Sequence, residues 1–231
     1  MQPPASKPLV SVIVRTMGRP ELGRALASVA AQTHRPLEIV LVDAADNGIE
    51  MSEYAGVPVR VVRKGRLTRA AAANAGLEAA PGDWLLFHDE DDAVELSHVA
   101  DLLDAAQRAQ AEVAYSQTRI LRSDGSERLL GGPYNREFLL RSNYLAIHAV
   151  LFSRAGVDAG HRFDERFEAF EDWDFWLQLS RRGDFAFTGK PTAIYRADEG
   201  RSGAGAGPNL DRDFVLAQRQ RILEKWGSGR I

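Results

Sequence analysis

The 231-residue chain is predicted to fold as an α/β protein with a mostly parallel central sheet flanked by helices. Two observations predict this. Short apolar runs rich in Val, Ile and Leu alternate with segments whose apolar residues recur at helical spacing. The runs are continuously apolar, which is typical of strands buried on both faces of a parallel sheet. The loops that carry function in such a sheet gather at the carboxyl ends of its strands.

The first half of the chain supplies four predicted strands and two helices between them. Pro20 suits the first turn of a helix, where its missing N–H is not needed, and Leu22, Leu26 and Val29 continue that helix. Thr68 is a predicted N-cap of the second helix. The predicted strands cover residues 9–15, 37–43, 57–64 and 84–87, and the predicted helices residues 21–32 and 68–77.

In the second half the regular alternation weakens. A helix around residues 96–106 leads to a strand at Val113 to Leu121 and a turn at Ser123 to Gly125. The glycine-rich segment 200–208 is predicted to be mobile. Further helices are predicted at residues 135–141, 171–182 and 211–226, and an apolar strand at residues 146–152.

Composition excludes several classes of protein. The 29 Lys and Arg against 32 Asp and Glu give a net charge of −3, which excludes a duplex nucleic-acid binder. Cysteine is absent, so disulfides, thiolate zinc sites and a cysteine nucleophile are excluded. The longest stretch without Asp, Glu, Lys or Arg, Ser142 to Ser153, is shorter than the roughly 20 residues of a membrane span. Residues 1–8 read as a flexible leader without a signal peptide, so we expect a cytoplasmic protein.

Four acidic residues, Asp89 to Asp92, follow the apolar run Trp84 to Phe87 directly. Neighbouring carboxylates repel one another, so their negative charge at the end of a folded strand has to be compensated. A hard divalent cation such as Mg²⁺ or Mn²⁺ does this most simply. Such ions share their shell with substrate phosphates, so a phosphorylated substrate is implied. The alternative is a solvated acidic loop without function. Thr16 and Asp43 also stand at strand ends, so three loops are expected to supply polar groups to one crevice.

A second acidic group, Glu171, Asp172 and Asp174, stands at the start of a predicted helix. Acids at a helix N-terminus are stabilised by the helix dipole, so ordinary capping is one interpretation. The aromatic neighbours Phe170 and Trp173 favour another, because partial desolvation raises the pKa of a carboxyl group toward that of a useful general base.

Five segments of the chain resemble, in order, the pattern of family-2 glycosyltransferases, over roughly residues 9–196. They are Val10 to Pro20, Glu38 to Asp43, Arg69 to Leu77, Gly82 to Asp92, and Phe163 to Glu165 with Glu171 to Asp174. The resemblance implies a GT-A fold and inverting transfer from a nucleotide-sugar donor. It also implies a single domain over residues 1–231, with a nucleotide-sugar-binding half at 9–125, an acceptor-binding half at 126–199 and a loop and helix at 200–231.

The resemblance also implies residue roles. Thr16, Arg19, Glu21 and Asp43 would contact the base and ribose, and Arg69 and Asn74 the nucleotide and sugar. Asp89, Glu90 and Asp91 correspond to an Asp-any-Asp motif, with Asp91 and Asp89 as the metal-binding pair and Asp89 and Glu90 also beside the donor. Asp172 resembles the general base of a Glu-Asp pair with Glu171.

The acceptor is a glycan, a lipid-linked saccharide or another hydroxyl compound, and peripheral membrane contact is compatible with it. His148 and Trp173 are candidate acceptor-site residues, each with a core position as its alternative. Gln218 to Arg221 is followed by Ile222, unlike the Gln-any-any-Arg-Trp motif of processive synthases, which favours transfer of a single sugar.

Two other functions are weighed beside transfer. One is a haloacid-dehalogenase-like phosphatase, whose nucleophile also lies in an Asp-any-Asp motif after an apolar strand, though normally after the first strand. The other is an inactive nucleotide-sugar-binding module. Both acidic groups argue against an inactive module, because a binding module has no need to hold destabilising charge.

Overall fold

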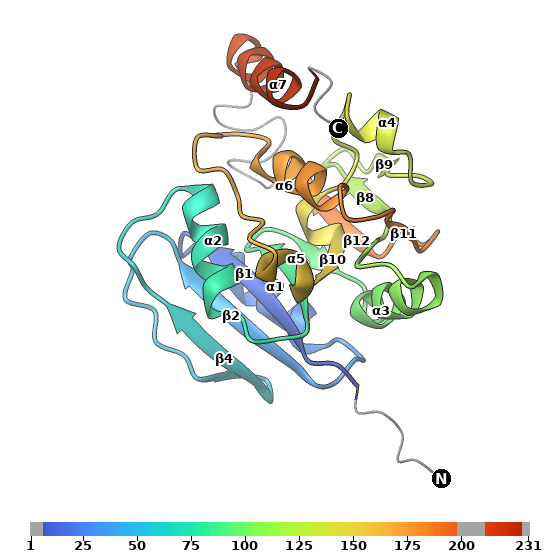
Figure 1. The fold of residues 1–231 in the computed structure, drawn as a ribbon. Helices are drawn as coiled ribbons and strands as arrows, with labels where there is room; N and C mark the ends of the chain where they lie inside the picture. The colour runs from blue at the N-terminus through green and yellow to red at the C-terminus, as the bar shows by residue number, and fades with distance from the viewer. Residues whose placement is uncertain (1–6, 198–210, 228–231) are drawn as a thin grey trace.

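The computed structural model describes residues 7–197 and 211–227. Residues 1–6 of the predicted leader and the glycine-rich segment 200–208 lie outside this description. The main sheet contains β1 Val10–Thr16, β2 Leu37–Asp43, β3 Glu53–Tyr54, β4 Val57–Val62, β5 Trp84–Asp89, β7 Val113–Tyr115, β10 Val150–Ser153 and β11 Ala186–Phe187. Their order across the sheet is β11-β7-β10-β5-β1-β2-β4-β3 (Figure 1). Strands β5, β1, β2 and β4 run parallel, and β10 runs antiparallel to both of its neighbours.

Helices cover both faces of this sheet. Helices α2 (Arg69–Ala79) and α6 (Glu171–Leu179) pack on one face, and α1 (Leu22–Ala30) and α3 (His98–Ala109) on the other. The middle of β1 is continuously apolar because both of its faces are buried: Ile13 joins the cluster under α2 and α6, while Val12 and Val14 join the opposite cluster. The predicted mostly parallel α/β sheet is confirmed. The Thr68 hydroxyl caps α2 by accepting a hydrogen bond from the Ala71 amide at 3.3 Å.

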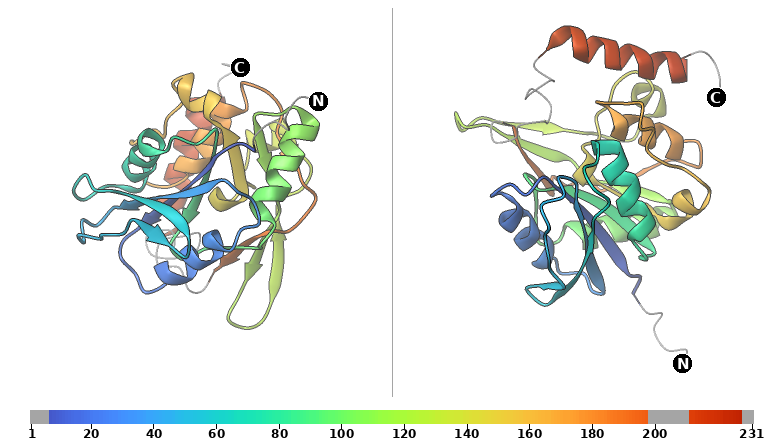
Figure 2. Two further views of the ribbon diagram at one scale, coloured as in Figure 1. Left: turned by 90° about the horizontal axis from the view of Figure 1, so that it is seen from below. Right: turned by 90° about the vertical axis from the view of Figure 1, so that its left-hand side faces the viewer.

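A second, four-stranded sheet has the order β6-β12-β8-β9 and consists of β6 Ala93–Val94, β8 Thr118–Leu121, β9 Glu127–Leu130 and β12 Ala193–Arg196. The single strand predicted at residues 113–121 is therefore wrong. The chain leaves the main sheet after Tyr115, and the amides of Ser116 and Gln117 bond to Ala149 and Lys190 instead of continuing one ladder. The hairpin of β8 and β9 projects from the body of the molecule in the left view of Figure 2.

The strand predicted at residues 146–152 is partly wrong as well. Its first half is a 3₁₀ turn, η1 (Ile147–Ala149), which carries His148, and β10 begins only at Val150. The remaining short helices are α4 (Arg136–Leu139) and α5 (Arg154–Asp158). Within the described residues, no helix is both long enough and apolar enough to cross a membrane.

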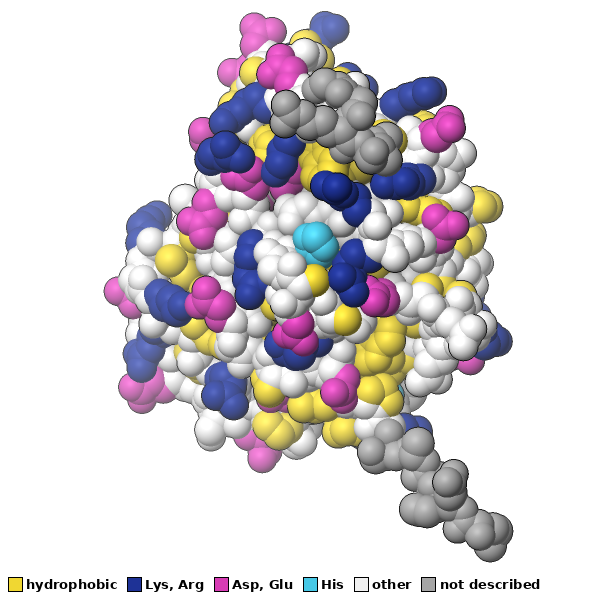
Figure 3. Space-filling view, viewed as in Figure 1, with side chains coloured by type: hydrophobic (Ala, Val, Ile, Leu, Met, Phe, Trp, Pro, Cys, Tyr) yellow, Lys and Arg dark blue, Asp and Glu magenta, His cyan; other side chains and the backbone are white. Residues whose placement is uncertain are grey.

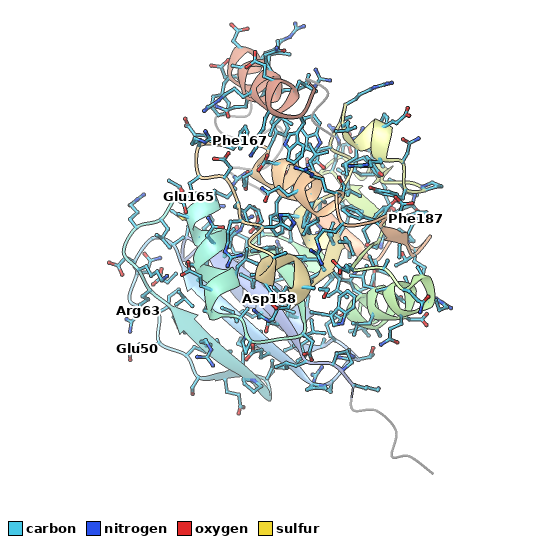
Figure 4. All side chains as sticks on the ribbon, in the orientation of Figure 1. Glu50, Arg63, Asp158, Glu165, Phe167 and Phe187 are labelled. Atoms are coloured by element: carbon cyan, nitrogen blue, oxygen red, sulfur yellow. The ribbon has the colours of Figure 1, made fainter. Side chains whose placement is uncertain are left out.

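Helix α7 (Arg212–Gly227) lies across one end of the molecule, beyond α6 (Figures 1 and 2). Asp174 of α6 is fully buried there and bonds to Lys225 Nζ at 2.7 Å and Trp226 Nε1 at 2.8 Å. Phe167 lies beneath the helix (Figure 4), with Lys225 Nζ 5.2 Å from its ring centroid. Lys and Arg side chains gather around the lower edge of α7 in Figure 3. The helix is thus held to α6 by a buried carboxylate.

Gly76 of α2 packs tightly on β1, and Gly23 of α1 offers a comparison in a more open place. A Cβ on Gly76 of α2 would overlap Ile13 Cγ2 and lie 3.3 Å from Val42 Cγ2, whereas a Cβ on Gly23 of α1 would have no heavy atom within 4 Å. We expect Gly76→Ala to lower the free energy of unfolding by about 1–3 kcal/mol through overpacking. The matched change Gly23→Ala raises it by up to about 1 kcal/mol, because alanine favours the helix. Urea denaturation measures both, and equal effects would contradict this packing.

Candidate functional site

Two adjoining cavities open at the carboxyl ends of β1 and β5. The larger has a volume of about 400 Å³ and the smaller about 270 Å³. Arg15, Arg69, Asp89 and Asp91 line both cavities, so the two share one charged wall. The smaller cavity continues along the loop after β1, and the larger extends toward α6 and the second sheet.

Arg15 is the buried cation of this wall, with 6% of its side chain exposed. It lies directly opposite Asp89 in the parallel register of β1 and β5. Its Nε and Nη2 donate to the two Asp89 oxygens at 2.7 Å each, and Nη1 lies 3.4 Å from Glu171 Oε1. Burial opposes ionisation of Asp89, but Arg15 outweighs it and holds the Asp89 pKa below its usual value. Sequence reasoning missed Arg15, although a basic residue ending an apolar buried strand was the available signal.

Glu90 holds the loop that follows β1. Its carboxylate is buried and accepts hydrogen bonds from Thr16 Oγ1 at 2.6 Å and from the amides of Met17 and Arg19 at 3.1 and 3.0 Å. Arg19 Nε lies 3.4 Å from the same carboxylate. Glu90 therefore shapes the smaller cavity by ordering its loop.

Asp92 and Asp91 differ in their partners. Asp92 is buried and pairs with His148, with 2.9 Å between Oδ2 and Nδ1. Burial by itself would lower the His148 pKa, but the Asp92 carboxylate outweighs it and raises that pKa. Asp91 lines both cavities, with Arg19 Nη1 3.8 Å from its carboxylate. Burial, followed by the charges of Asp92 and Asp89, raises the Asp91 pKa to about 6.

Of the four acids Asp89 to Asp92, Asp91 is the one with a carboxylate suited to hold a cation. Three of the four carboxylates are engaged, Asp89 by Arg15, Glu90 by the loop and Asp92 by His148. The raised pKa of Asp91 indicates a carboxylate short of positive charge. In residues 7–197 and 211–227, no group of three or more His, Asp or Glu side chains is arranged to hold a metal ion. The donor set matches a hard cation that takes one or two carboxylates and completes its shell with phosphate and water.

The three acids at the start of α6 point to different partners. Glu171 is buried between Arg15 and Arg69, whose Nε lies 3.6 Å from Glu171 Oε1. Asp174 binds α7, as described above. Asp172 lines the larger cavity, where burial, followed by the charge of Glu171, raises its pKa to about 7. A carboxyl group that faces a cavity with a pKa near neutrality, as Asp172 does, is suited to act as a general base.

The start of α6 is set by Phe170, whose φ of 62° is uncommon for a residue other than glycine. This left-handed residue turns the chain abruptly into the helix. Phe170, Glu171 and Asp172 consequently all line the larger cavity. Such strained positions persist where the surrounding structure fixes them, often at functional sites.

Four predicted site residues lie outside the lining of the two cavities. Glu21 occupies the N-cap position of α1. Asp43 is fully buried and accepts hydrogen bonds from the amides of Asn47 and Ile49 at 3.1 and 3.2 Å. Asn74 ties α2 to Phe163 through two hydrogen bonds of 2.9 and 3.0 Å. Trp173 is a core residue, 1% exposed, and its Nε1 donates to the Leu139 carbonyl at 2.6 Å, so the acceptor role expected for it is corrected.

The remaining predicted residues come together as expected. Thr16, Arg19, Arg69, Asp89, Glu90 and Asp91 line the smaller cavity. His148 lines the larger one beside Asp172, although it is 1% exposed and held by Asp92.

The Arg15 cluster makes a prediction about stability. Arg15→Met leaves Asp89 and Glu171 without their shared cation, so we expect the free energy of unfolding to fall by about 3–5 kcal/mol. Arg182 makes a similar two-bonded contact with Glu112, at 2.5 and 2.8 Å, on the surface. Arg182→Met should cost no more than about 1 kcal/mol. Guanidinium denaturation of both variants measures the difference, and a similar small loss in both would refute the role given to Arg15.

Comparison with known proteins identifies the family to which the chain belongs. Residues 11–173 match the sequence profile of glycosyl transferase family 2. The chain is 26% identical to the uncharacterised glycosyltransferase YwdF of Bacillus subtilis (strain 168) over 237 residues, covering 96% of this chain and 85% of that protein.

Two solved structures share the fold. The S. aureus TarS fragment 1–349 in complex with UDP-GlcNAc has a TM-score of 0.66 at 17% identity, over 94% of this chain and 71% of that one. The mannosyltransferase PcManGT from Pyrobaculum calidifontis, in complex with GDP-Man and Mn²⁺, has a TM-score of 0.62 at 14% identity, over 99% and 77%.

The profile match covers most of the chain, from β1 into the first turn of α6, and includes Asp89 to Asp92, Glu171 and Asp172 but not Asp174. The fold and the family agree, which excludes the phosphatase alternative. The chain belongs to glycosyl transferase family 2 and is a glycosyltransferase.

Proposed function

We propose that the enzyme transfers a single sugar from a nucleotide-sugar donor to an acceptor hydroxyl, with inversion at the anomeric carbon. One observation carries the proposal: Asp172, with its pKa raised to about 7, faces the same cavity as Asp89 and Asp91. A single displacement needs a base on the acceptor side and stabilisation of the leaving diphosphate, which a cation held by Asp89 and Asp91 would supply.

The donor nucleotide is assigned to the smaller cavity. The loop from Thr16 to Arg19 forms one side of it, ordered by Glu90, and Arg69 at the start of α2 forms another. Helix N-termini and arginine side chains favour anionic phosphate groups. Support comes from the two related folds, whose structures contain UDP-GlcNAc in one case and GDP-Man in the other.

A divalent cation, Mg²⁺ or Mn²⁺, is assigned to Asp91, with Asp89 beside it. A bound cation would stabilise the negative charge that builds on the leaving diphosphate. Asp89 keeps its ionised form through Arg15, so one carboxylate beside the cation stays negative whether or not Asp91 is protonated. The Mn²⁺ in the PcManGT structure supports the choice of ion class.

Asp172 is the general base. The acceptor oxygen attacks the anomeric carbon while a carboxylate oxygen of Asp172 takes its proton, and the bond from that carbon to the diphosphate oxygen breaks. One displacement inverts the configuration and needs no covalent enzyme intermediate. Glu171 does not serve as the base, because its buried carboxylate is held by Arg15 and Arg69.

The acceptor enters from the larger cavity. Leu130 and Tyr195 of the second half of the chain line that cavity together with Asp172, and Ile120 of the same second sheet lines it as well. These residues support assigning the acceptor mainly to the second half of the chain. The acceptor is a glycan, a lipid-linked saccharide or another compound with a free hydroxyl.

The cation assignment is tested by calorimetric titration with UDP, GDP, dTDP, CMP and ADP, in Mn²⁺ and in EDTA. We expect one nucleotide to bind in Mn²⁺, with binding weakened at least about tenfold by EDTA or by Asp91→Ala. Asp104→Ala, which removes an exposed acid paired with Arg108 on α3, is the matched control and should bind normally. If Asp91→Ala bound the nucleotide at wild-type affinity, and equally well in Mn²⁺ and in EDTA, a cation at Asp91 would be excluded.

The base assignment is tested with the donor that the titration identifies. Asp172→Asn should lower the rate of sugar transfer about 10²- to 10⁴-fold while nucleotide affinity stays unchanged. In the wild type, kcat/KM should fall about tenfold per pH unit below a pKa of about 7, because the protonated carboxyl cannot accept a proton. Asp158→Asn, on the surface of α5 (Figure 4), is the control. Undiminished transfer by Asp172→Asn would exclude this base.

A further inference from the structure

We propose that Asn143 is a positioning residue for Asp172, whose side-chain amide orients the carboxylate and favours its ionised form. The proposal rests on the proposed function, in which Asp172 is the general base. Asn143 lies in the loop between α4 and η1, and it lines the larger cavity together with Asp172. Neither the family resemblance nor the comparisons point to it.

The orientation of the Asn143 amide is fixed by its two partners. Its Oδ1 accepts a hydrogen bond from the Leu145 amide at 3.2 Å, and its Nδ2 donates to Asp172 Oδ2 at 3.2 Å. A flipped amide would place its oxygen against the carboxylate and its NH₂ against an N–H, which is unfavourable at both ends. Asn143 therefore presents a donor to Asp172.

Asp172 receives one hydrogen bond on each oxygen. Oδ1 accepts from the Trp173 backbone amide at 2.7 Å, and Oδ2 accepts from Asn143. The first bond lies within the opening turn of α6 and moves with that helix. The second comes from a different part of the chain and therefore fixes the rotation of the carboxylate relative to the cavity.

Charged and titratable groups line the cavity of Asp172 from several elements: Glu171 on α6, Arg69 on α2, Arg15 on β1, Asp89 on β5, Arg128 on β9, His148 in η1 and Tyr195 on β12. Glu171 on α6 raises the pKa of Asp172, and Arg69 on α2 lowers it. Arg15 on β1 is also within electrostatic reach of Asp172, and Asp89 and Asp91 line the same cavity. Asp89 and Glu171 together balance the charges of Arg15 and Arg69, since Asp89 pairs with Arg15 and Glu171 lies close to both arginines. A neutral donor such as Asn143 can then adjust the base without changing the net charge of the site.

The neutrality of this donor matters chemically. A Lys or Arg at the same place would hold Asp172 strongly ionised and make it a weaker base, since base strength falls with pKa. An apolar residue would leave the carboxyl protonated over a wider range of pH. An amide contributes a hydrogen bond to the ionised form while leaving the pKa close to neutrality.

The test compares Asn143→Asp and Asn143→Ala with the wild type. Asp has the shape of Asn and keeps the acceptor for the Leu145 amide, but it replaces the donor to Asp172 with a negative charge. The chain is labelled with [¹³Cγ]Asp, and the pH titration of Asp172 is followed by carbon NMR, with the signal assigned by its loss in Asp172→Asn. We expect the Asp172 pKa to rise by about one pH unit in Asn143→Ala and by more in Asn143→Asp.

Asn135→Asp is the matched control. Asn135 caps α4 in the same region and accepts from the Phe138 amide at 2.8 Å, a role that Asp fills equally well. This variant adds the same charge and should leave the Asp172 titration unchanged. Nucleotide affinity measured by calorimetry should match the wild type in all three variants, which shows that each has folded.

A second readout is the pH profile of transfer. In Asn143→Ala the acid limb of the kcat/KM profile should shift to higher pH by as much as the Asp172 pKa rises, and the KM for the donor should stay unchanged. An Asp172 titration that stays in place in both Asn143 variants overturns the proposal, even where Asp172→Asn is inactive. Full activity of Asp172→Asn overturns the base role itself, and the positioning role with it. Because the labelled carboxyl reports without substrate, the two failures are distinguishable.

Discussion

The shared ion pairing of Arg15 is the interaction on which the rest of the site depends. A guanidinium buried at the end of β1 has to be compensated, and its two partners come from β5 and from α6. Asp89 ends β5 and Glu171 begins α6, so one buried cation fixes the distance between these two elements. Neither carboxylate can move without exposing unpaired charge in a poorly solvated place.

The acidic run at the end of β5 illustrates how repulsion between neighbours is resolved. Three of the four carboxylates bind different partners. Asp89 binds an arginine, Glu90 binds loop amides and Asp92 binds a histidine. What looks in sequence like one metal-binding cluster is three structural contacts around Asp91. The strand end thereby gains rigidity from most of its charge, while Asp91 lines both cavities.

The sequence predicted the parallel strands and the acidic side chains of the cavity lining, because these follow local patterns. Apolar runs identify β1, β2, β4 and β5, and acids at strand and helix ends identify Asp91 and Asp172. What it missed has no local pattern. Arg15 is separated by 74 residues from Asp89 and by 156 from Glu171, so their contact exists only in the folded chain. The two-residue strands β3, β6 and β11 are likewise strands only through the neighbours that pair with them.

The passage of the chain between the two sheets has a consequence for how the enzyme can evolve. Strands β7 and β11 run parallel in the main sheet, and their continuations β8 and β12 run parallel in the second, joined at the bend by the bond from the Gln117 amide to Lys190. The hairpin of β8 and β9 extends from this bend, and its tip around Gly125 is exposed. An insertion at that tip lengthens the hairpin of β8 and β9 without altering the register of β1 and β5, so the second sheet can change while the charged strand ends of the main sheet are kept.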